Sequence, residues 1–514
     1  MKKIWFVVGF LTLAPVHLLC QTTSTQWSGY GHDPQHTAIS ANKSQSLSNI
    51  HWCTPVDLSP PGGGTGDLFI HYGSPIVTAA NTVLIPVKTG DTGGFQIQAY
   101  KSASSCGFSA LPFTGPNTPL YTLSTDYSVP GHNWFPPYSP VLSIRNRLYY
   151  PGAGGTVYYR DLVDSATGPS GQLAFYGIAL YQANSATFNS TVTINTPITT
   201  DRYGSVYFGY LVTGPNPANL PLGGGLARIT ITAQGSYVST NTLAAAVGDN
   251  TVSQVAMNAG PALSNDQRTL YAAVSNGGTG YLVSLNSATL AVTGYVSLLD
   301  PVSGGPATVT NDSSASPMVG PDGDVYFGVL EQTCCTHNDR GWMLHYDSTL
   351  TQTKIPGSFG WDTTAAVVPS SLVPSYTGTS RYLILTKYNN YIDFADGHNK
   401  IAVLDPNAGM QDEYSVANVT VMNEVLTILG VTSNGPDGAV SEWCINTAAI
   451  DPFTKSALVN SEDGWLYRWD FTTNTFTERI QLTGGLGEAY TPTVIGPDGT
   501  VFAINEAVVF AVGN

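Results

Sequence analysis

The chain has few charged residues, and few of those are basic. Only 10% of its 514 residues are Asp, Glu, Lys or Arg, and 34 acidic side chains against 19 basic ones give a formal charge of −15. Binding to nucleic acid requires clustered Lys and Arg against the phosphates, so we expect no nucleic-acid partner. An acidic balance of this kind is typical of a protein that its net charge keeps soluble.

Cysteine is scarce as well, and its spacing excludes several kinds of site. The chain has six cysteines, and none lies in a CxxC or CxxCH pattern. The usual signals for a zinc ribbon, a thioredoxin-like pair and covalently attached haem are therefore missing. Without Cys20 five cysteines remain, so at least one thiol is unpaired within a monomer.

Sustained helical periodicity is missing, and only one long apolar run occurs. That run covers residues 4–19 and follows Lys2 and Lys3, which is the pattern of a secretory signal peptide at residues 1–20. It is too short to be a convincing membrane span, and we expect no transmembrane segment. A lipid-modified Cys20 is the competing interpretation, but Leu19 is bulky where a lipoprotein signal has a small residue. We expect a secreted, periplasmic or cell-surface protein.

A short phrase recurs along the chain: a small residue and Pro, an apolar pair, a turn, and then an aromatic or β-branched strand. Clear examples are SPIV at residues 74–77 and SPMV at residues 316–319, the latter followed by a GPDG turn and DVYF. Further copies begin at Ser139, Thr196, Gly260 and Thr491, and degenerate ones lie near Thr364 and Thr447. Strand units that repeat every roughly 45 to 80 residues are typical of radially arranged sheets. The eight copies predict an all-β fold, an eight-bladed β-propeller of four-stranded antiparallel blades, without long helices.

The two ends of the chain are predicted to meet in the last blade. The final repeat ends at Asn514 after only three strands, whereas residues 50–55 form a strand without a blade just before the first repeat. Pairing the two would remove exposed sheet edges, which invite aggregation. We therefore expect a monomeric, single propeller over residues 50–514, closed by an N-terminal strand, and a lead-in at residues 21–49 that wraps the surface.

Several elements match one family of repeats. A Trp-bearing strand at residues 50–52 precedes the SPIV phrase, DVYFG occupies residues 324–328, KIAVLD occupies residues 400–405, and WSGYGHDPQHT occupies residues 27–37. In these features the chain resembles the PQQ-like β-propeller repeat family over nearly all of its mature length. The resemblance implies the fold and leaves the activity open, because the family includes quinoprotein dehydrogenases, outer-membrane assembly scaffolds and secreted proteins without a known activity.

Two disulfides are expected. Adjacent Cys334 and Cys335 fall between the second and third strands of blade five. The resemblance implies one role for them, because quinoprotein alcohol dehydrogenases place such a bridge against the quinone ring; we favour a vicinal disulfide that stiffens a long loop, or two separate thiols. Cys53 and Cys106 form the second expected pair, since the closing strand and a turn of blade one lie at neighbouring blade ends. Cys444 is then a buried thiol.

Two sets of loops emerge on one face of a propeller, around its channel: those that enter each innermost strand and those between the second and third strands. Aromatic and carboxylate side chains there would suit a sugar or another polar ligand, because rings stack and carboxylates orient hydroxyls. Each residue alone could instead cap free backbone groups at a blade end. The candidates are His132, Trp134, His337, Asp339, Arg340, Trp361, Asp362, Tyr388, Asn389, Glu442, Trp443, Glu488 and Tyr490, and His71 lies in the same kind of loop.

Two functions from different classes fit these features. The preferred one is a binding or scaffold module whose channel mouth meets a small polar ligand or an envelope protein, with no cofactor and no metal. The alternative is a periplasmic PQQ-dependent alcohol or sugar dehydrogenase. PQQ would then lie near Cys334 and Cys335, calcium would polarise its carbonyls, and Asp362 or Glu488 would take the substrate proton. A hydrolase or lyase on the same face is a weaker third possibility.

Overall fold

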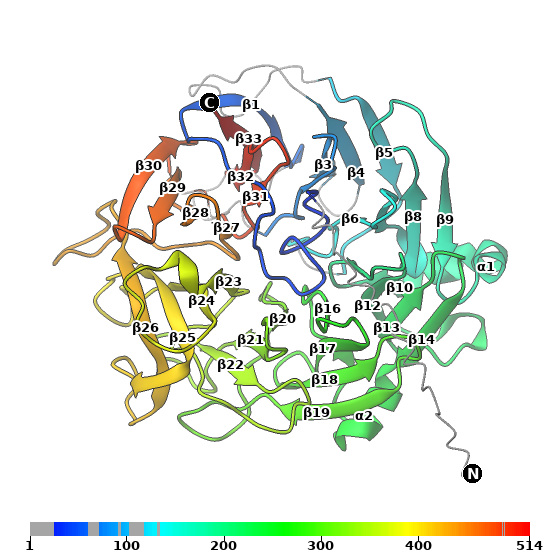
Figure 1. Ribbon diagram of the computed structural model, residues 1–514. Helices are drawn as coiled ribbons and strands as arrows, with labels where there is room; N and C mark the ends of the chain where they lie inside the picture. The colour runs from blue at the N-terminus through cyan, green and yellow to red at the C-terminus, as the bar shows by residue number, and fades with distance from the viewer. Residues whose placement is uncertain are drawn as a thin grey trace, which may run out of the picture.

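In the computed structural model, the strands form eight small antiparallel sheets arranged radially around one axis (Figure 1). The structure describes residues 25–59, 71–90, 94–101, 118–130, 134–485, 487 and 489–514. The predicted all-β, eight-bladed propeller is therefore confirmed. No helix in this part of the chain is long and apolar enough to cross a bilayer.

Blades one to four each come from consecutive strands. From the channel outward, blade one contains β2 (Ile76–Val77), β3 (Val83–Lys88), β4 (Phe95–Tyr100) and β5 (Tyr121–Thr125), and blade two contains β6 (Val141–Leu142), β7 (Leu148–Pro151), β8 (Thr156–Arg160) and β9 (Ser170–Ala174). In blade three, β10 (Val192–Ile194) and β11 (Thr199–Thr200) both pair with β12 (Val206–Val212), which is followed by β13 (Gly225–Ile229) and β14 (Gly235–Ser239). In blade four, β15 (Gln254–Val255) and β16 (Ala262–Leu263) both pair with β17 (Thr269–Ser275), which is followed by β18 (Gly280–Asn286) and β19 (Val292–Ser297).

Blades five to seven follow the same plan. Their strands are β20 (Met318–Val319), β21 (Val325–Val329) and β22 (Trp342–Tyr346) in blade five; β23 (Ala366–Pro369), β24 (Tyr382–Tyr388), β25 (Lys400–Gln411) and β26 (Thr420–Leu429) in blade six; and β27 (Ala449–Asp451), β28 (Ser456–Asn460), β29 (Trp465–Asp470) and β30 (Thr475–Gln481) in blade seven. Blade five departs from the predicted four strands, because isolated bridges from Met343 to Gly357 and from Tyr346 to Thr353 stand beside β22 instead of a fourth strand.

The last blade combines both ends of the described chain. β31 (Val494–Ile495), β32 (Val501–Asn505) and β33 (Val508–Gly513) come from the C-terminus, and β1 (Asn49–Pro55) completes the sheet by antiparallel pairing with β33. Cys53 lies opposite Phe510 in this register. The predicted closure is confirmed, and it leaves the outer edge of the three C-terminal strands covered.

The Asp-Gly turns predicted at residues 320–323 and 496–499 connect innermost strands to their neighbours. Gly323 has φ +94° and Gly499 has φ +88°, a region that glycine enters without the steric cost of a Cβ. The strands after each turn then pair as expected, with Val319 opposite Val325 in blade five.

The lead-in does not wrap the surface, so that expectation was wrong. Residues 27–40 run through the middle of the ring, where Figure 1 shows them in dark blue. Innermost strands are sheet edges, and their inward backbone groups need partners. The lead-in supplies these partners to six blades. Its hydrogen-bond partners on the innermost strands are Val77, Leu142, Leu263, Val319, Val367 and Ile450.

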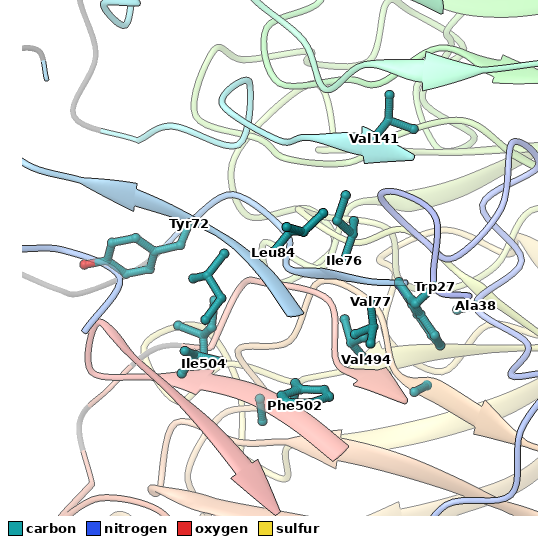
Figure 2. Packing of buried hydrophobic residues seen from close by; sticks show 14 of the residues in the cluster. Trp27, Ala38, Tyr72, Ile76, Val77, Leu84, Val141, Val494, Phe502 and Ile504 are labelled. Atoms are coloured by element: carbon teal, nitrogen blue, oxygen red, sulfur yellow. The ribbon is translucent and has the colours of Figure 1, made fainter. Parts of the chain in front are cut away.

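Apolar side chains join the lead-in to neighbouring blades. Figure 2 shows Ile76 and Leu84 of blade one, Phe502 and Ile504 of blade eight and Trp27 of the lead-in in one buried cluster. Burial of apolar area between sheets is the main stabilising contribution in such a ring. The lead-in is therefore part of the core.

Two α-helices, of 14 and 8 residues, interrupt the strands of the described chain. α1 (Ile178–Thr191) buries only Tyr181 and Phe188, so the sequence shows no amphipathic stripe there. α2 (Thr240–Val247) carried a usable signal, because Ser239 caps its first turn and Gly248 ends it in the left-handed region. Short 3-10 turns are η1 (Ala153–Gly155), η2 (Pro217–Asn219) and η3 (Ser370–Leu372).

Candidate binding site

Loops that enter the innermost strands gather at one end of the channel, which we call the upper face. Tyr30 of the lead-in lies beneath them. Its hydroxyl is 2.5 Å from Asn446 Oδ1 and 3.0 Å from both Ser314 O and Thr364 Oγ1. These partners precede the innermost strands of blades five, six and seven. The lead-in therefore occupies the channel as far as Tyr30, and the upper face lies beyond it.

A buried histidine–aspartate pair connects blades one and six on the upper face. His71 Nε2 is 2.7 Å from Asp362 Oδ2, and both side chains are almost fully buried. The His71 ring stacks on Tyr490 at 4.4 Å and lies 4.0 Å from Trp134, centroid to centroid. His71 and Asp362 both have positive φ, at +52° and +49°. Non-glycine residues in this region are uncommon and cluster at functional sites.

Asp362 is held as a carboxylate by its surroundings. Burial alone raises the pKa of Asp362, but the charge and hydrogen bond of His71, the charge of Lys387 and the Ser314 N–H together outweigh it and lower the pKa below its usual value. Ser314 donates through both its backbone N–H and its hydroxyl, at 2.6 and 2.7 Å. The Asp362 carboxylate is therefore oriented by Ser314 as well as by His71.

Lys387 completes this group. It belongs to β24, in which every residue is buried, and is 1% exposed. Its Nζ lies 4.3 Å from the ring centroid of Tyr490 and has no hydrogen-bond partner among the described residues. We call His71, Trp134, Asp362, Lys387 and Tyr490 the channel cluster. It combines a buried lysine with the half-buried rings of Trp134 and Tyr490, both of which contact the His71 ring.

A second group lies beside the channel cluster and is called the acid–thiol cluster: Glu442, Cys444 and Glu462. Cys444 Sγ is 3.4 Å from Glu462 Oε2 and 3.8 Å from Glu442 Oε2. Burial, and then the negative charge of Glu462, raise the pKa of Glu442 to about 7, against an opposing effect of Lys387. Burial also raises the pKa of Glu462.

Several predicted ligand residues lie inside the fold. Arg340 is fully buried, donates to Ser358 O, and lies 3.6 Å from the ring centroid of Tyr414 and 4.4 Å from that of Tyr388. Tyr388 is itself 1% exposed. Their cation–π contacts stabilise the junction of blades five and six. These two side chains are therefore structural and do not reach the channel cluster's surface.

His337, Trp443 and Asn389 are buried too. His337 stacks on Trp342 with centroids 3.7 Å apart. Trp443 packs edge-on against Tyr467, and its backbone N–H donates to Asn389 Oδ1. Because Trp443 lies between Glu442 and Cys444 but points into the core, the prediction of a ligand-facing indole there does not match its position.

The adjacent cysteines form a disulfide, and hydrogen bonds to Glu331 hold their loop. Cys334 and Cys335 are bonded to each other, and the carboxylate of Asp339 lies with both sulfurs inside a 4.8 Å group. Glu331 accepts hydrogen bonds from three backbone N–H groups of this loop. Burial, and then Glu331, raise the pKa of Asp339.

Of the remaining predicted residues, the structure describes some and not others. Trp361 is half-buried, and its backbone N–H donates to Arg340 O. His132 and Glu488 lie outside the described residues, as does Cys106, so the structure does not place the predicted Cys53–Cys106 bridge. Glu442 was among the predicted residues, whereas Lys387, Cys444 and Glu462 were not predicted as part of a site. The usable signal was a lysine inside the apolar run at residues 382–388.

Comparisons with known proteins agree on the fold. No family model matches the chain, and no curated protein matches it in sequence. Among solved structures, the chain is similar to a europium-containing methanol dehydrogenase, with 11% identity, 93% of this chain and 89% of that chain covered, and a TM-score of 0.51. It is also similar to the quinohemoprotein alcohol dehydrogenase from Comamonas testosteroni, with 10% identity, 95% and 81% covered, and a TM-score of 0.51. At this identity the likeness shows the propeller fold alone.

Proposed function

We propose that the protein is a secreted or cell-envelope binding module that takes a small anionic, polyhydroxylated ligand, such as a sugar acid, at the channel cluster. The observation that carries this proposal is the Lys387 ammonium, which is buried and has no hydrogen-bond partner among the described residues. A buried charge without hydrogen bonds is costly. A ligand carboxylate would supply the missing acceptors.

The neighbours of Lys387 suit the rest of such a ligand. His71 Nε2 lies 2.7 Å from the Asp362 carboxylate, and His71 Nδ1 is buried without a hydrogen-bond partner in the described chain. In the tautomer whose Nε2–H donates to Asp362, Nδ1 is an acceptor. Nδ1 can accept a hydroxyl proton. The half-buried rings of Trp134 and Tyr490 can pack on the apolar face of a sugar ring.

Calorimetric titration of the mature protein tests this proposal. We expect glucuronate or galacturonate to bind and the corresponding neutral sugars to bind at least about tenfold more weakly, since one charge-assisted contact of about 1.5 to 3 kcal/mol is lost. Lys387→Met should remove the preference, whereas Lys455→Met, at an exposed lysine, should keep it. Equal binding of acid and neutral sugar, or an unchanged Lys387→Met variant, would disprove the proposed ligand class.

Secretion is part of the proposal and is tested separately. Residues 1–20 have the pattern of a signal peptide. We expect Edman sequencing of the exported protein to begin near Gln21. A blocked N-terminus at Cys20 with membrane-bound protein would instead support the lipid-anchored alternative.

A quinoprotein dehydrogenase is the second candidate, favoured by the fold likeness and the disulfide at Cys334 and Cys335. The residues do not fit the cofactor well. PQQ is a polycarboxylate, and the carboxylate of Asp339 lies beside the two sulfurs. In the channel cluster and acid–thiol cluster, Lys387 is the only lysine or arginine, which can pair with the one carboxylate of a sugar acid but not with the several carboxylates of PQQ. We expect no quinone absorbance after incubation with PQQ and calcium, and no dye-linked alcohol oxidation. Bound quinone with turnover would replace the binding-module proposal.

A further inference from the structure

The acid–thiol cluster has the composition of a metal site, although the sequence led us to expect none. Its three potential ligand atoms, one from each of Glu442, Cys444 and Glu462, lie within 4.8 Å of one another. Cys444 is 1% exposed, whereas the two glutamates are half-buried and reachable from solvent. Glu442 and Cys444 flank Trp443, and Glu462 comes from the turn between β28 and β29.

The spacing of the ligand atoms matches tetrahedral coordination. Zinc binds thiolate at about 2.3 Å and carboxylate oxygen at about 2.0 to 2.2 Å, so sulfur and oxygen ligands of one ion are separated by about 3.5 Å. The two observed Sγ–Oε2 distances are 3.4 Å to Glu462 and 3.8 Å to Glu442. A single ion between the three atoms would therefore require only small side-chain adjustments.

The charges of the acid–thiol cluster also favour a bound cation. Two carboxylates and a thiolate would carry three negative charges, which a divalent ion reduces to one. Lys387 acts electrostatically on Glu442, and its buried ammonium has no hydrogen-bond partner among the described residues. With the ion bound, Lys387 balances the remaining negative charge.

We propose that Glu442, Cys444 and Glu462 bind one divalent metal ion of the zinc class, with the fourth coordination position open. The thiolate selects this class, because calcium and magnesium take oxygen ligands only. Three protein ligands and one open position characterise sites at which zinc holds water or a further ligand. This site is distinct from the proposed sugar-acid contact at Lys387 and goes beyond it.

Cobalt substitution tests the proposal in the full mature protein. After dialysis against chelator, we expect one cobalt ion per chain by elemental analysis and a near-ultraviolet thiolate-to-cobalt charge-transfer band. Cys444→Ser should abolish the band, and Glu462→Gln should weaken cobalt and zinc binding by more than about 100-fold, since even changes next to a metal ligand cost about 10- to 100-fold. Glu413→Gln, at an exposed glutamate, is the matched control and should bind as the unaltered protein does.

The outcomes separate this site from the proposed function. Failure of the unaltered protein to take up cobalt, or persistence of the band in Cys444→Ser, would overturn the metal site. Thermal unfolding of each variant identifies loss of fold, and a folded Glu462→Gln that keeps full affinity would also overturn it. Lys387→Met should retain one cobalt ion while losing sugar-acid binding, so either proposal can fail while the other stands.

Discussion

The two ends of the central channel are lined by the same innermost strands but differ in how their ionisable groups are satisfied. In the lead-in, His36 Nδ1 is 2.7 Å from Pro317 O, and the Asp33 carboxylate accepts backbone N–H groups of its own turn. On the upper face, Lys387 Nζ and His71 Nδ1 are buried without hydrogen bonds to described residues. Buried polar groups are nearly always paired. The hydrogen-bonded groups of the lead-in are thus typical of a structural core, whereas the groups of the upper face are those expected at a ligand-binding site.

The largest expected effect concerns the lead-in core. Trp27→Ala should lower the free energy of unfolding by about 3 to 5 kcal/mol, because it leaves a cavity where blades one and eight meet the lead-in. Trp361→Ala, at a half-buried indole of the upper face, should cost clearly less. Urea unfolding curves of both variants measure the difference. Equal losses would mean that the lead-in is not more important to the core than the upper face.

The next effect concerns a buried acid that does have partners. Burial raises the pKa of Asp412, but hydrogen bonds and charge from His337, and the hydroxyl of Ser358, bring it down to about 2. Its value in the unfolded chain is about 3.9, so Asp412 contributes on the order of 2 kcal/mol above about pH 4, and this is lost as the pH falls towards 2.

Asp412→Asn tests this contribution. The variant should be less stable than the unaltered protein at pH 7, and this difference in the free energy of unfolding should be smaller at pH 3. Guanidinium unfolding of both proteins at the two pH values measures the difference. A difference in stability that stays constant with pH would show that the Asp412 charge does not matter. The contrast with Lys387, which makes no hydrogen bond to a described residue, would then weaken.

A smaller effect is expected at the boundary between the two ends. Tyr30→Phe removes the hydroxyl that contacts Ser314, Thr364 and Asn446, and this should cost about 1 to 3 kcal/mol because the partners stay buried. Tyr490→Phe is the control on the upper face and should cost less. Thermal unfolding compares the two. A larger loss at Tyr490 would contradict the assignment of Tyr30 as the structural contact.

The smallest effect on stability is expected at Lys387 itself. Lys387→Met should change the free energy of unfolding by less than about 1 kcal/mol, since Nζ makes no hydrogen bond to a described residue, and removal of a costly buried ammonium offsets the loss of its charge beside Asp362 and Glu442. Lys88→Met is the contrast, because Lys88 is buried in an ion pair with Asp57. A strongly destabilised Lys387→Met variant would mean that Lys387 has a structural role, against the ligand site.

Local patterns predicted the blades because each repeat carries its own turn and strand signals. The Asp-Gly turn at Gly323 was readable, and the missing fourth strand at the C-terminus identified the pairing of residues 50–55 with β33. The position of the lead-in was not readable. Nothing in residues 27–40 distinguishes a segment that lies on the surface from one whose backbone pairs with six strand edges.

The sequence predicted which face of the propeller carries the candidate site, but not which side chains contact one another there. Loop position suggested Asp362 and Tyr490, and the structure brings both side chains to His71. It also suggested Arg340 and Trp443, which are buried by neighbouring blades. Whether a loop side chain turns outward or inward depends on packing between blades, which a single repeat does not contain.

The amino-acid sequence by itself determined the number of blades, their order and the way the ring closes, because turns and strand periodicity act over a few residues. Only the tertiary structure decided which side chains share a charge environment. Lys387 and Asp362 both belong to blade six and Glu442 to the loop that enters blade seven, and only the packing of these neighbouring blades brings their charges within range of one another. Electrostatic interactions depend on distance in space and on burial, and neither can be read from spacing along the chain.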